Sequence, residues 1–204
     1  MPALAAYCQA YGRWAEAERA LAKMKNSADG LIIKTVSGNL IQNPMVGIAN
    51  KAMADMVRQV IGTLRTIHSK YPEFRHNDLH LGNVLVDDTG KKVRFLLTDF
   101  GLSRLTKRGS NPVINSGSYR NSGISNSTSY KYDAHYFLNA LDSEITSGLP
   151  QTRAFLDRML PGTYRGANTN KVTAYRLKNG ASNAGLPSFT DILKDPFLSG
   201  KPAR

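Results

Sequence analysis

The sequence predicts an α+β protein that is mainly helical. Two stretches, residues 2–25 and about 46–70, repeat apolar residues at three- and four-residue steps, as amphipathic helices do. Two pairs of short aliphatic segments are separated by turn residues, which indicates two hairpins. Further helical patterns follow a long polar stretch. With 204 residues and 41% apolar content, the chain can bury a hydrophobic core.

The first helix is predicted over residues 2–25, where Pro2 suits the first turn. Its apolar stripe favours a buried face or a helix–helix interface and consists of Leu4, Tyr7, Tyr11, Trp14, Leu21 and Met24. The segments LIIKTV and LIQ then flank Ser37-Gly38-Asn39, a typical hairpin turn. Asn43-Pro44 ends this hairpin.

A second long helix is predicted from about Val46 to Lys70, and Tyr71-Pro72 stops it. Its expected buried stripe is Met53, Met56, Val57, Val60, Ile61, Leu64 and Ile67. Two short strands follow, Val84–Val86 and Val93–Thr98, joined by the turn DDTGKK.

A long loop rich in Ser, Asn and Gly is predicted over residues 105–130. Loops of this length in a compact domain are usually functional or mobile. The segments KYDAHYFLNALDSEI and PQTRAFLDRML then predict helices. PSFTDILKDPFL predicts a last short helix, capped by Ser188 or Thr190.

Composition limits the classes of function. The net charge of +12 fits either a soluble basic protein or one with a phosphate-rich partner, such as nucleic acid, a nucleotide or an acidic membrane surface. No apolar run approaches the ~18 residues of a membrane span, and no signal-peptide pattern is seen. Cys8 is the single cysteine, so an internal disulfide is excluded. We therefore expect an intracellular protein that is not secreted. Cys8 and three histidines lack metal-ligand spacing, so no zinc site is predicted: His68, His80 and His135.

The segments RHNDLHLGNVLV and LLTDFGLSR carry the candidate chemistry. Asp78 and Asn83 lie in a loop that leads into one predicted strand, and Asp99 follows the next. Two neighbouring strands would bring these three side chains together at one end. Hard oxygen ligands of this kind suit Mg²⁺. We expect Gly101 to free the backbone beside Asp99, and Phe100 to pack inward and fix it.

These residues match the catalytic loop H-x-D-x-x-x-x-N and the D-F-G of protein kinases, so residues 60–204 resemble the C-terminal lobe of that family. The helix ending at Lys70 resembles the helix before the catalytic loop, and Asp133 resembles the aspartate that opens the central helix of the lobe. ILKDPFL resembles the close of the domain. The HNDLH variant is most similar to kinases of large DNA viruses and to atypical small-molecule kinases.

The resemblance implies phosphoryl transfer from ATP, with Mg²⁺, to Ser or Thr of a protein substrate. The implied catalytic residues are Asp78, which would orient the acceptor hydroxyl, with His76 and His80. The implied metal ligands are Asn83 and Asp99. The implied cofactor-binding residues are Asn83, Asp99, Phe100 and Gly101.

The chain departs from the kinase pattern in several places. Asn77 replaces an arginine, His80 replaces a lysine that touches the transferred phosphate, and A-P-E is absent. No G-x-G-x-x-G precedes residue 75, so no N-terminal lobe is recognised. Lys34 in LIIK has either a nucleotide role or, as an exposed hairpin lysine, none. The site is therefore either catalytic or part of a scaffold that is inactive alone.

Residues 3 to about 58 resemble a different family, the small terminase subunit of tailed phages. The likeness lies in LAAYCQAYGRWAEAERAL and GLIIKTVSGNLIQNPMVGIANKAMADM. It implies self-association through the N-terminal helices and contact with viral DNA, which would be non-specific because no base-reading motif is seen. We thus divide the chain into a helix–hairpin–helix segment, residues 1–58, and a kinase-like lobe, residues 59–204. Both resemblances point toward viruses, so the implied location is the host cytoplasm or the virion. The alternative to a viral kinase is a viral structural or DNA-packaging protein.

Overall fold

The computed structural model describes residues 32–34, 40–42, 44–105, 107, 109, 111–114, 119, 129–145, 149–165 and 185–199. This part of the chain is mainly helical with two small antiparallel sheets, which confirms the predicted α+β class. The helix predicted over residues 2–25, Cys8, the turn Ser37-Gly38-Asn39 and most of the loop predicted over residues 105–130 lie outside the described residues.

The predicted first hairpin is present. Strand β1 (Ile32–Lys34) pairs antiparallel with β2 (Leu40–Gln42). Helix α2 (Pro44–Lys70) begins two residues later, so the helix starts with the proline of Asn43-Pro44. Proline suits this position because its missing N–H would have no partner in the first turn of a helix.

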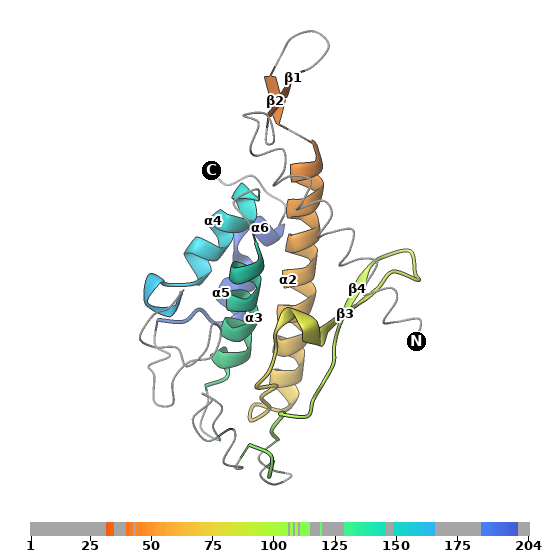
Figure 1. Cartoon of the computed structure of the whole chain (residues 1–204). Helices are drawn as coiled ribbons and strands as arrows, with labels where there is room; N and C mark the ends of the chain where they lie inside the picture. The colour runs from red at the N-terminus through yellow and green to blue at the C-terminus, as the bar shows by residue number, and fades with distance from the viewer. Residues whose placement is uncertain are drawn as a thin grey trace.

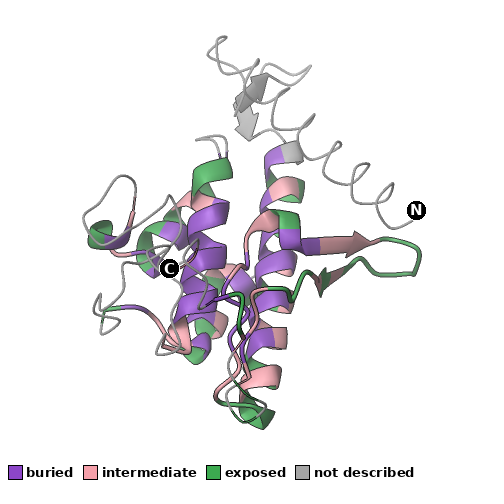
Figure 2. Cartoon of the chain, turned by 60° about the horizontal axis from the view of Figure 1, so that its bottom comes forward, coloured by how far each residue is buried: buried purple, intermediate pink, exposed green. Residues whose placement is uncertain are grey.

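Helix α2 is the long central helix, which lies between the other helices and the second hairpin (Figure 1). It contacts α3 (Lys131–Glu144), α4 (Pro150–Met159), α5 (Phe189–Lys194) and α6 (Pro196–Ser199) as well as one strand of the second sheet. Its predicted stripe is buried except for Ile67, which is half-buried. The buried face of α2 extends toward its N-terminus through Val46 and Asn50. In Figure 2 this face lies against the buried face of α3.

The second hairpin consists of β3 (Val84–Asp87) and β4 (Arg94–Leu97), which pair antiparallel as predicted. Its two faces differ. Phe95 and Leu97 pack against the core, whereas Leu96 is 43% exposed and pairs with Leu85 on the outer face. Gln59 ties α2 to this hairpin by accepting from the N–H of Phe95. The single-turn 3₁₀ helix η1 (Leu81–Asn83) leads into β3.

The predicted last helix is two helices, α5 and α6, separated at Asp195. Pro196 explains the break, because a residue before proline disfavours helical geometry and Asp195 is extended with ψ at 136°. Ser188 caps α5 as predicted, through a capping box with Asp191. Asp195 also accepts two hydrogen bonds from Arg158 on α4, at 2.8 and 2.7 Å.

Two polar contacts hold the helices in place. Asn50 of α2 is buried, and its Oδ1 accepts from the N–H and Oγ1 of Thr152 at 2.9 and 2.7 Å. This satisfies an N–H in the first turn of α4 that has no partner within that helix. Arg58 of α2 donates to the carbonyl of Leu198 in α6.

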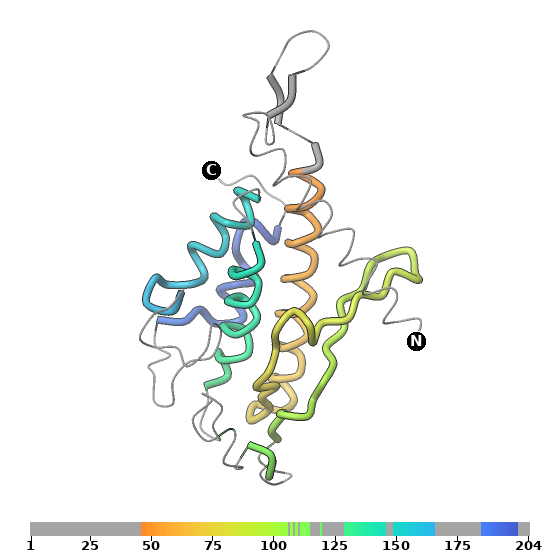
Figure 3. Tube along the Cα trace, in the orientation of Figure 1, coloured from red at the N-terminus to blue at the C-terminus, as the bar shows by residue number. Residues whose placement is uncertain are grey.

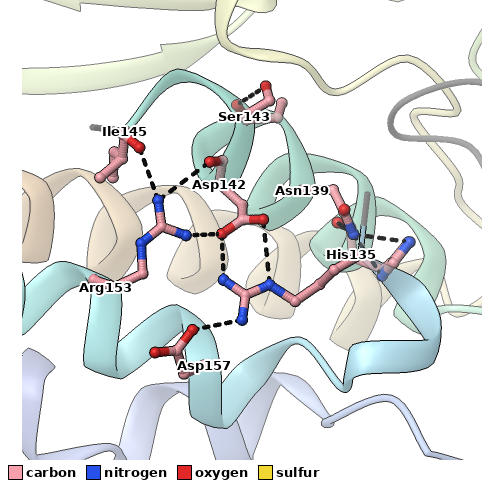
Figure 4. A network of polar contacts seen from close by, with 9 residues as sticks. His135, Asn139, Asp142, Ser143, Ile145, Arg153 and Asp157 are labelled. Atoms are coloured by element: carbon pink, nitrogen blue, oxygen red, sulfur yellow. Dashed lines mark hydrogen bonds and ion pairs between the residues drawn. The ribbon is translucent and has the colours of Figure 1, made fainter. Parts of the chain in front are cut away.

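A charged network joins α3 to α4 (Figure 4). The Asp142 carboxylate lies between Arg153 and Arg165, which also contacts Asp157. Burial tends to raise the pKa of Asp142, but its hydrogen bonds and ion pairs with the two arginines prevail and lower it. The same contacts raise the pKa of Arg165 above its ordinary value. Among the described residues, no helix is long and apolar enough to cross a membrane.

Candidate active site

Asp133, at the start of α3, anchors the loop that follows α2. Its carboxylate accepts hydrogen bonds from the backbone N–H groups of His76 and Asn77, at 2.8 and 2.9 Å. Asn77 has a positive φ of 66°, a conformation that asparagine adopts more readily than most residues. Its side chain donates to the Leu102 carbonyl at 2.9 Å. Two hydrogen bonds accepted by one buried carboxylate thus fix the backbone immediately before Asp78.

Two arginines surround this anchor. Arg75 and Arg104 face each other across a β-bridge and exchange two backbone hydrogen bonds, at 3.0 and 2.8 Å. Figure 3 shows the chain after α2 and the chain after β4 running side by side there. Burial raises the pKa of Asp133, while its N–H bonds and the charges of His76 and Arg75 oppose that rise. Burial lowers the pKa of both arginines, and the charge of Asp133 opposes that decrease.

Asp78 and Asn83 lie together at the start of β3. Asn83 is buried, and its Nδ2 donates to the Asp78 carbonyl at 2.7 Å, which closes the loop between them. The Asp78 side chain keeps 19% of its surface exposed. One carboxylate oxygen accepts from the hydroxyl of Tyr136 on α3 at 3.1 Å. The other lies 3.8 Å from Nε2 of His80.

Asp99 reaches the same end of the hairpin from β4. The N–H of Thr98 donates to the Asn83 carbonyl at 3.0 Å, so the backbones that carry Asn83 and Asp99 are adjacent. Asp99 is exposed, has φ at 57° and accepts from the N–H of Gly101 at 3.2 Å. A Cβ at Gly101 would lie 3.2 Å from the same carboxylate oxygen. Gly101 therefore allows a close approach to Asp99, and the unusual φ belongs to Asp99 itself.

Phe100 does not pack inward as expected. Its side chain is 49% exposed, and its ring lies 5.1 Å from that of His76 and 6.4 Å from that of Phe74. The reason is that the fully buried His76 ring already occupies the space beneath it. His76 Nε2 contacts the Thr98 carbonyl at 3.0 Å, so this ring links the catalytic-loop segment to the residue before Asp99.

His80 has a defined orientation. Its Nδ1 accepts from the N–H of Gly82 at 3.0 Å and caps η1. In the neutral ring the proton must then lie on Nε2, the nitrogen that faces Asp78. The His80 side chain is 38% exposed, so it is accessible to a ligand.

The residues available for Mg²⁺ are the amide oxygen of Asn83 and the carboxylate of Asp99. The described residues include no group of three or more His, Cys, Asp or Glu side chains that could hold a metal. Two oxygen donors still fit Mg²⁺, because this ion is commonly held by one or two protein groups together with substrate phosphates and water. The outer apolar pair of Leu85 and Leu96 lies on the hairpin beside these donors.

The sequence indicated most residues of this site, but not Tyr136 or the buried pair Arg75 and Arg104. Asp78, Asn83 and Asp99 lie at one end of the hairpin, and His76 and His80 flank Asp78. Tyr136 was missed because the loop that carries Asp78 meets α3 only in the tertiary structure; its signal, a tyrosine three residues after Asp133, is weak alone. Lys34 lies in β1, and its side chain is outside the described part.

Comparisons with known proteins support both resemblances. Residues 1–60 match the family model "phage terminase, small subunit". A protein of Acanthamoeba polyphaga mimivirus, R400, whose name provisionally describes it as a serine/threonine-protein kinase, is 27% identical over 145 residues. The match covers 56% of this chain, and the chain spans 31% of the length of that protein. No solved structure matches the chain.

Proposed function

We propose that this chain carries a phosphotransferase lobe of the Ser/Thr protein-kinase type that uses ATP with Mg²⁺. The observation that carries the proposal is the convergence of Asp78, Asn83 and Asp99 at one end of the β3–β4 hairpin, with their loop held by Asp133. The similarity to the mimivirus protein supports the same class and a viral origin.

In the proposed reaction, the Asp78 carboxylate orients the hydroxyl of a Ser or Thr side chain. The hydroxyl oxygen bonds to the γ-phosphorus of ATP as the bond to the β–γ bridging oxygen breaks, and ADP leaves with that electron pair. The hydroxyl proton passes to Asp78 and then to water. His80 Nε2–H faces the same carboxylate and can donate to a phosphate oxygen.

Asn83 and Asp99 would hold Mg²⁺, which supplies positive charge to the phosphates when bound. The outer face of Leu85 and Leu96 offers an apolar surface for the nucleotide base. Because no Gly-rich loop is recognised before residue 75, we propose that transfer by this lobe alone is slow and becomes efficient only when a second set of groups covers the phosphates.

Calorimetric titration of ATP with and without Mg²⁺ tests the proposal directly. Binding should require Mg²⁺, disappear in Asp99→Asn and survive in Asp88→Asn, a matched change of an exposed acid in the β3–β4 turn. Asp78→Asn should keep the binding and lose transfer. Absence of binding at millimolar ATP, or equal binding without Mg²⁺, would exclude the proposed site.

A second candidate rests on the terminase match over residues 1–60. In this alternative the chain is a viral structural or DNA-packaging protein, whose N-terminal segment self-associates and whose net charge of +12 contacts DNA. The logarithm of the DNA-binding constant should then fall linearly with the logarithm of salt concentration. Light scattering should show an oligomer. A monomer with no DNA binding at low salt would exclude this candidate.

A further inference from the structure

We propose that Tyr136 is a positioning residue for Asp78, which deepens and rests on the phosphotransferase function proposed above. Tyr136 lies on α3, is 4% exposed and donates its hydroxyl proton to Oδ1 of Asp78 at 3.1 Å. A hydrogen bond to an ionised carboxylate is stronger than one between neutral groups. This bond therefore restricts the rotation of the Asp78 carboxylate.

The ring of Tyr136 is itself fixed. It stacks on Tyr132, with centroids 6.0 Å apart and planes 15° apart, and Tyr132 is 2% exposed. Both tyrosines belong to α3, the helix whose Asp133 carboxylate holds the backbone of the Asp78 loop. One helix thus fixes this loop twice, through the main chain before Asp78 and through the side chain of Asp78.

The two oxygens of Asp78 consequently have different surroundings. Oδ1 is engaged by Tyr136, while Oδ2 faces Nε2 of His80 at 3.8 Å, a distance too long for a hydrogen bond. Because Oδ1 already accepts from Tyr136, an acceptor hydroxyl in the proposed reaction would meet Oδ2, on the side from which His80 can contact a phosphate oxygen. Tyr136 would act through Asp78 and need not touch the substrate.

A double-mutant cycle on the full chain tests the contact without needing turnover. Tyr136→Phe removes one hydroxyl and keeps the stacked ring, and Asp78→Ala removes the acceptor. The two changes should couple by about tenfold or more in the unfolding equilibrium constant. Tyr132→Phe, which leaves the Tyr136–Asp78 bond in place, should not couple with Asp78→Ala. Absence of coupling would overturn the proposal.

Transfer of the γ-phosphate from radiolabelled MgATP to Ser/Thr peptides tests the positioning role. In Tyr136→Phe, kcat should fall about 10- to 100-fold while KM for ATP stays unchanged. An unchanged kcat would overturn the inference, as would an equal loss in Tyr132→Phe, which would indicate a purely structural effect. If the double-mutant cycle shows coupling but the wild-type protein neither binds MgATP nor transfers phosphate, the result would instead refute the proposed function on which the inference rests.

Discussion

Replacing Asp133 by asparagine should destabilise the fold strongly, because this one side chain satisfies two backbone donors. The carboxylate shares its two oxygens between the N–H groups of His76 and Asn77. In Asp133→Asn one oxygen becomes an NH₂ group, so one buried N–H loses its acceptor and faces another donor. An unsatisfied buried donor of this kind costs about 1–3 kcal/mol.

The lost charge adds to that cost. Arg75 and Arg104 are 8% and 6% exposed, and Asp133 is the buried acid whose charge acts on both. Removing one partner of a buried ionic group costs about 3–5 kcal/mol in other proteins. Because this figure already includes the groups left unpaired, we expect a total loss of about 3–5 kcal/mol, against about 5–15 kcal/mol for the stability of a typical domain.

Urea unfolding at pH 7 measures this loss, with the exposed Asp88→Asn as control, for which a change within about 0.5 kcal/mol is expected. Hydrogen exchange of the His76 and Asn77 amides should accelerate in Asp133→Asn even where the chain still folds. A loss below about 1 kcal/mol would refute the reasoning, because it would mean that Asp133 is already neutral in the folded protein.

Three further changes test other parts of the fold and site. Asp142→Asn should lower the free energy of unfolding by about 1–3 kcal/mol at pH 7. Because the pKa of Asp142 is lowered in the folded protein, this loss of stability should be complete above the ordinary pKa of 3.8 and shrink below it. Urea unfolding of both proteins at pH 7 and pH 3 measures the change. Asn50→Ala should cost about 2–4 kcal/mol because Thr152 loses the acceptor for two donors, whereas the exposed Lys51→Ala should change thermal stability little. Gly101→Ala should weaken Mg²⁺-dependent ATP binding several-fold in calorimetry with little effect on stability, since its Cβ would press on the Asp99 carboxylate; unchanged binding would argue against a ligand role for Asp99.

Local signals in the sequence predicted most of the helices and strands. The apolar period of α2, the turn between β3 and β4, and the Ser188 cap all depend on residues close together in the chain, so their patterns can be recognised directly. The break at Asp195 also has a local signal, because Pro196 follows it directly. By contrast, the contact of Asn50 with Thr152 joins residues 102 positions apart, and no local pattern indicates it.

The candidate site likewise contains residues that spacing in the sequence indicates and residues whose arrangement depends on tertiary contacts. Spacing alone grouped Asp78 and Asn83, because a short loop must keep them near each other. The exposure of Phe100 could not be predicted, since it depends on the His76 ring filling the space below. Tyr136 was equally hidden, because its hydroxyl reaches Asp78 only once α3 packs beside the loop.

The continuity of α2 also determines which changes of length the protein can tolerate. Its buried side includes Val46 and Asn50, in the terminase-matched part, and Leu64, beyond it. Each residue advances an α-helix by about 100° and 1.5 Å. One residue inserted near position 58 would rotate the preceding turns by about 100° and direct Val46 and Asn50 away from α4. Seven inserted residues would restore the phase to within about 20° while moving those turns by about 10 Å. The segment that resembles a terminase subunit and the segment that resembles a kinase can therefore share this helix only where their apolar periods coincide.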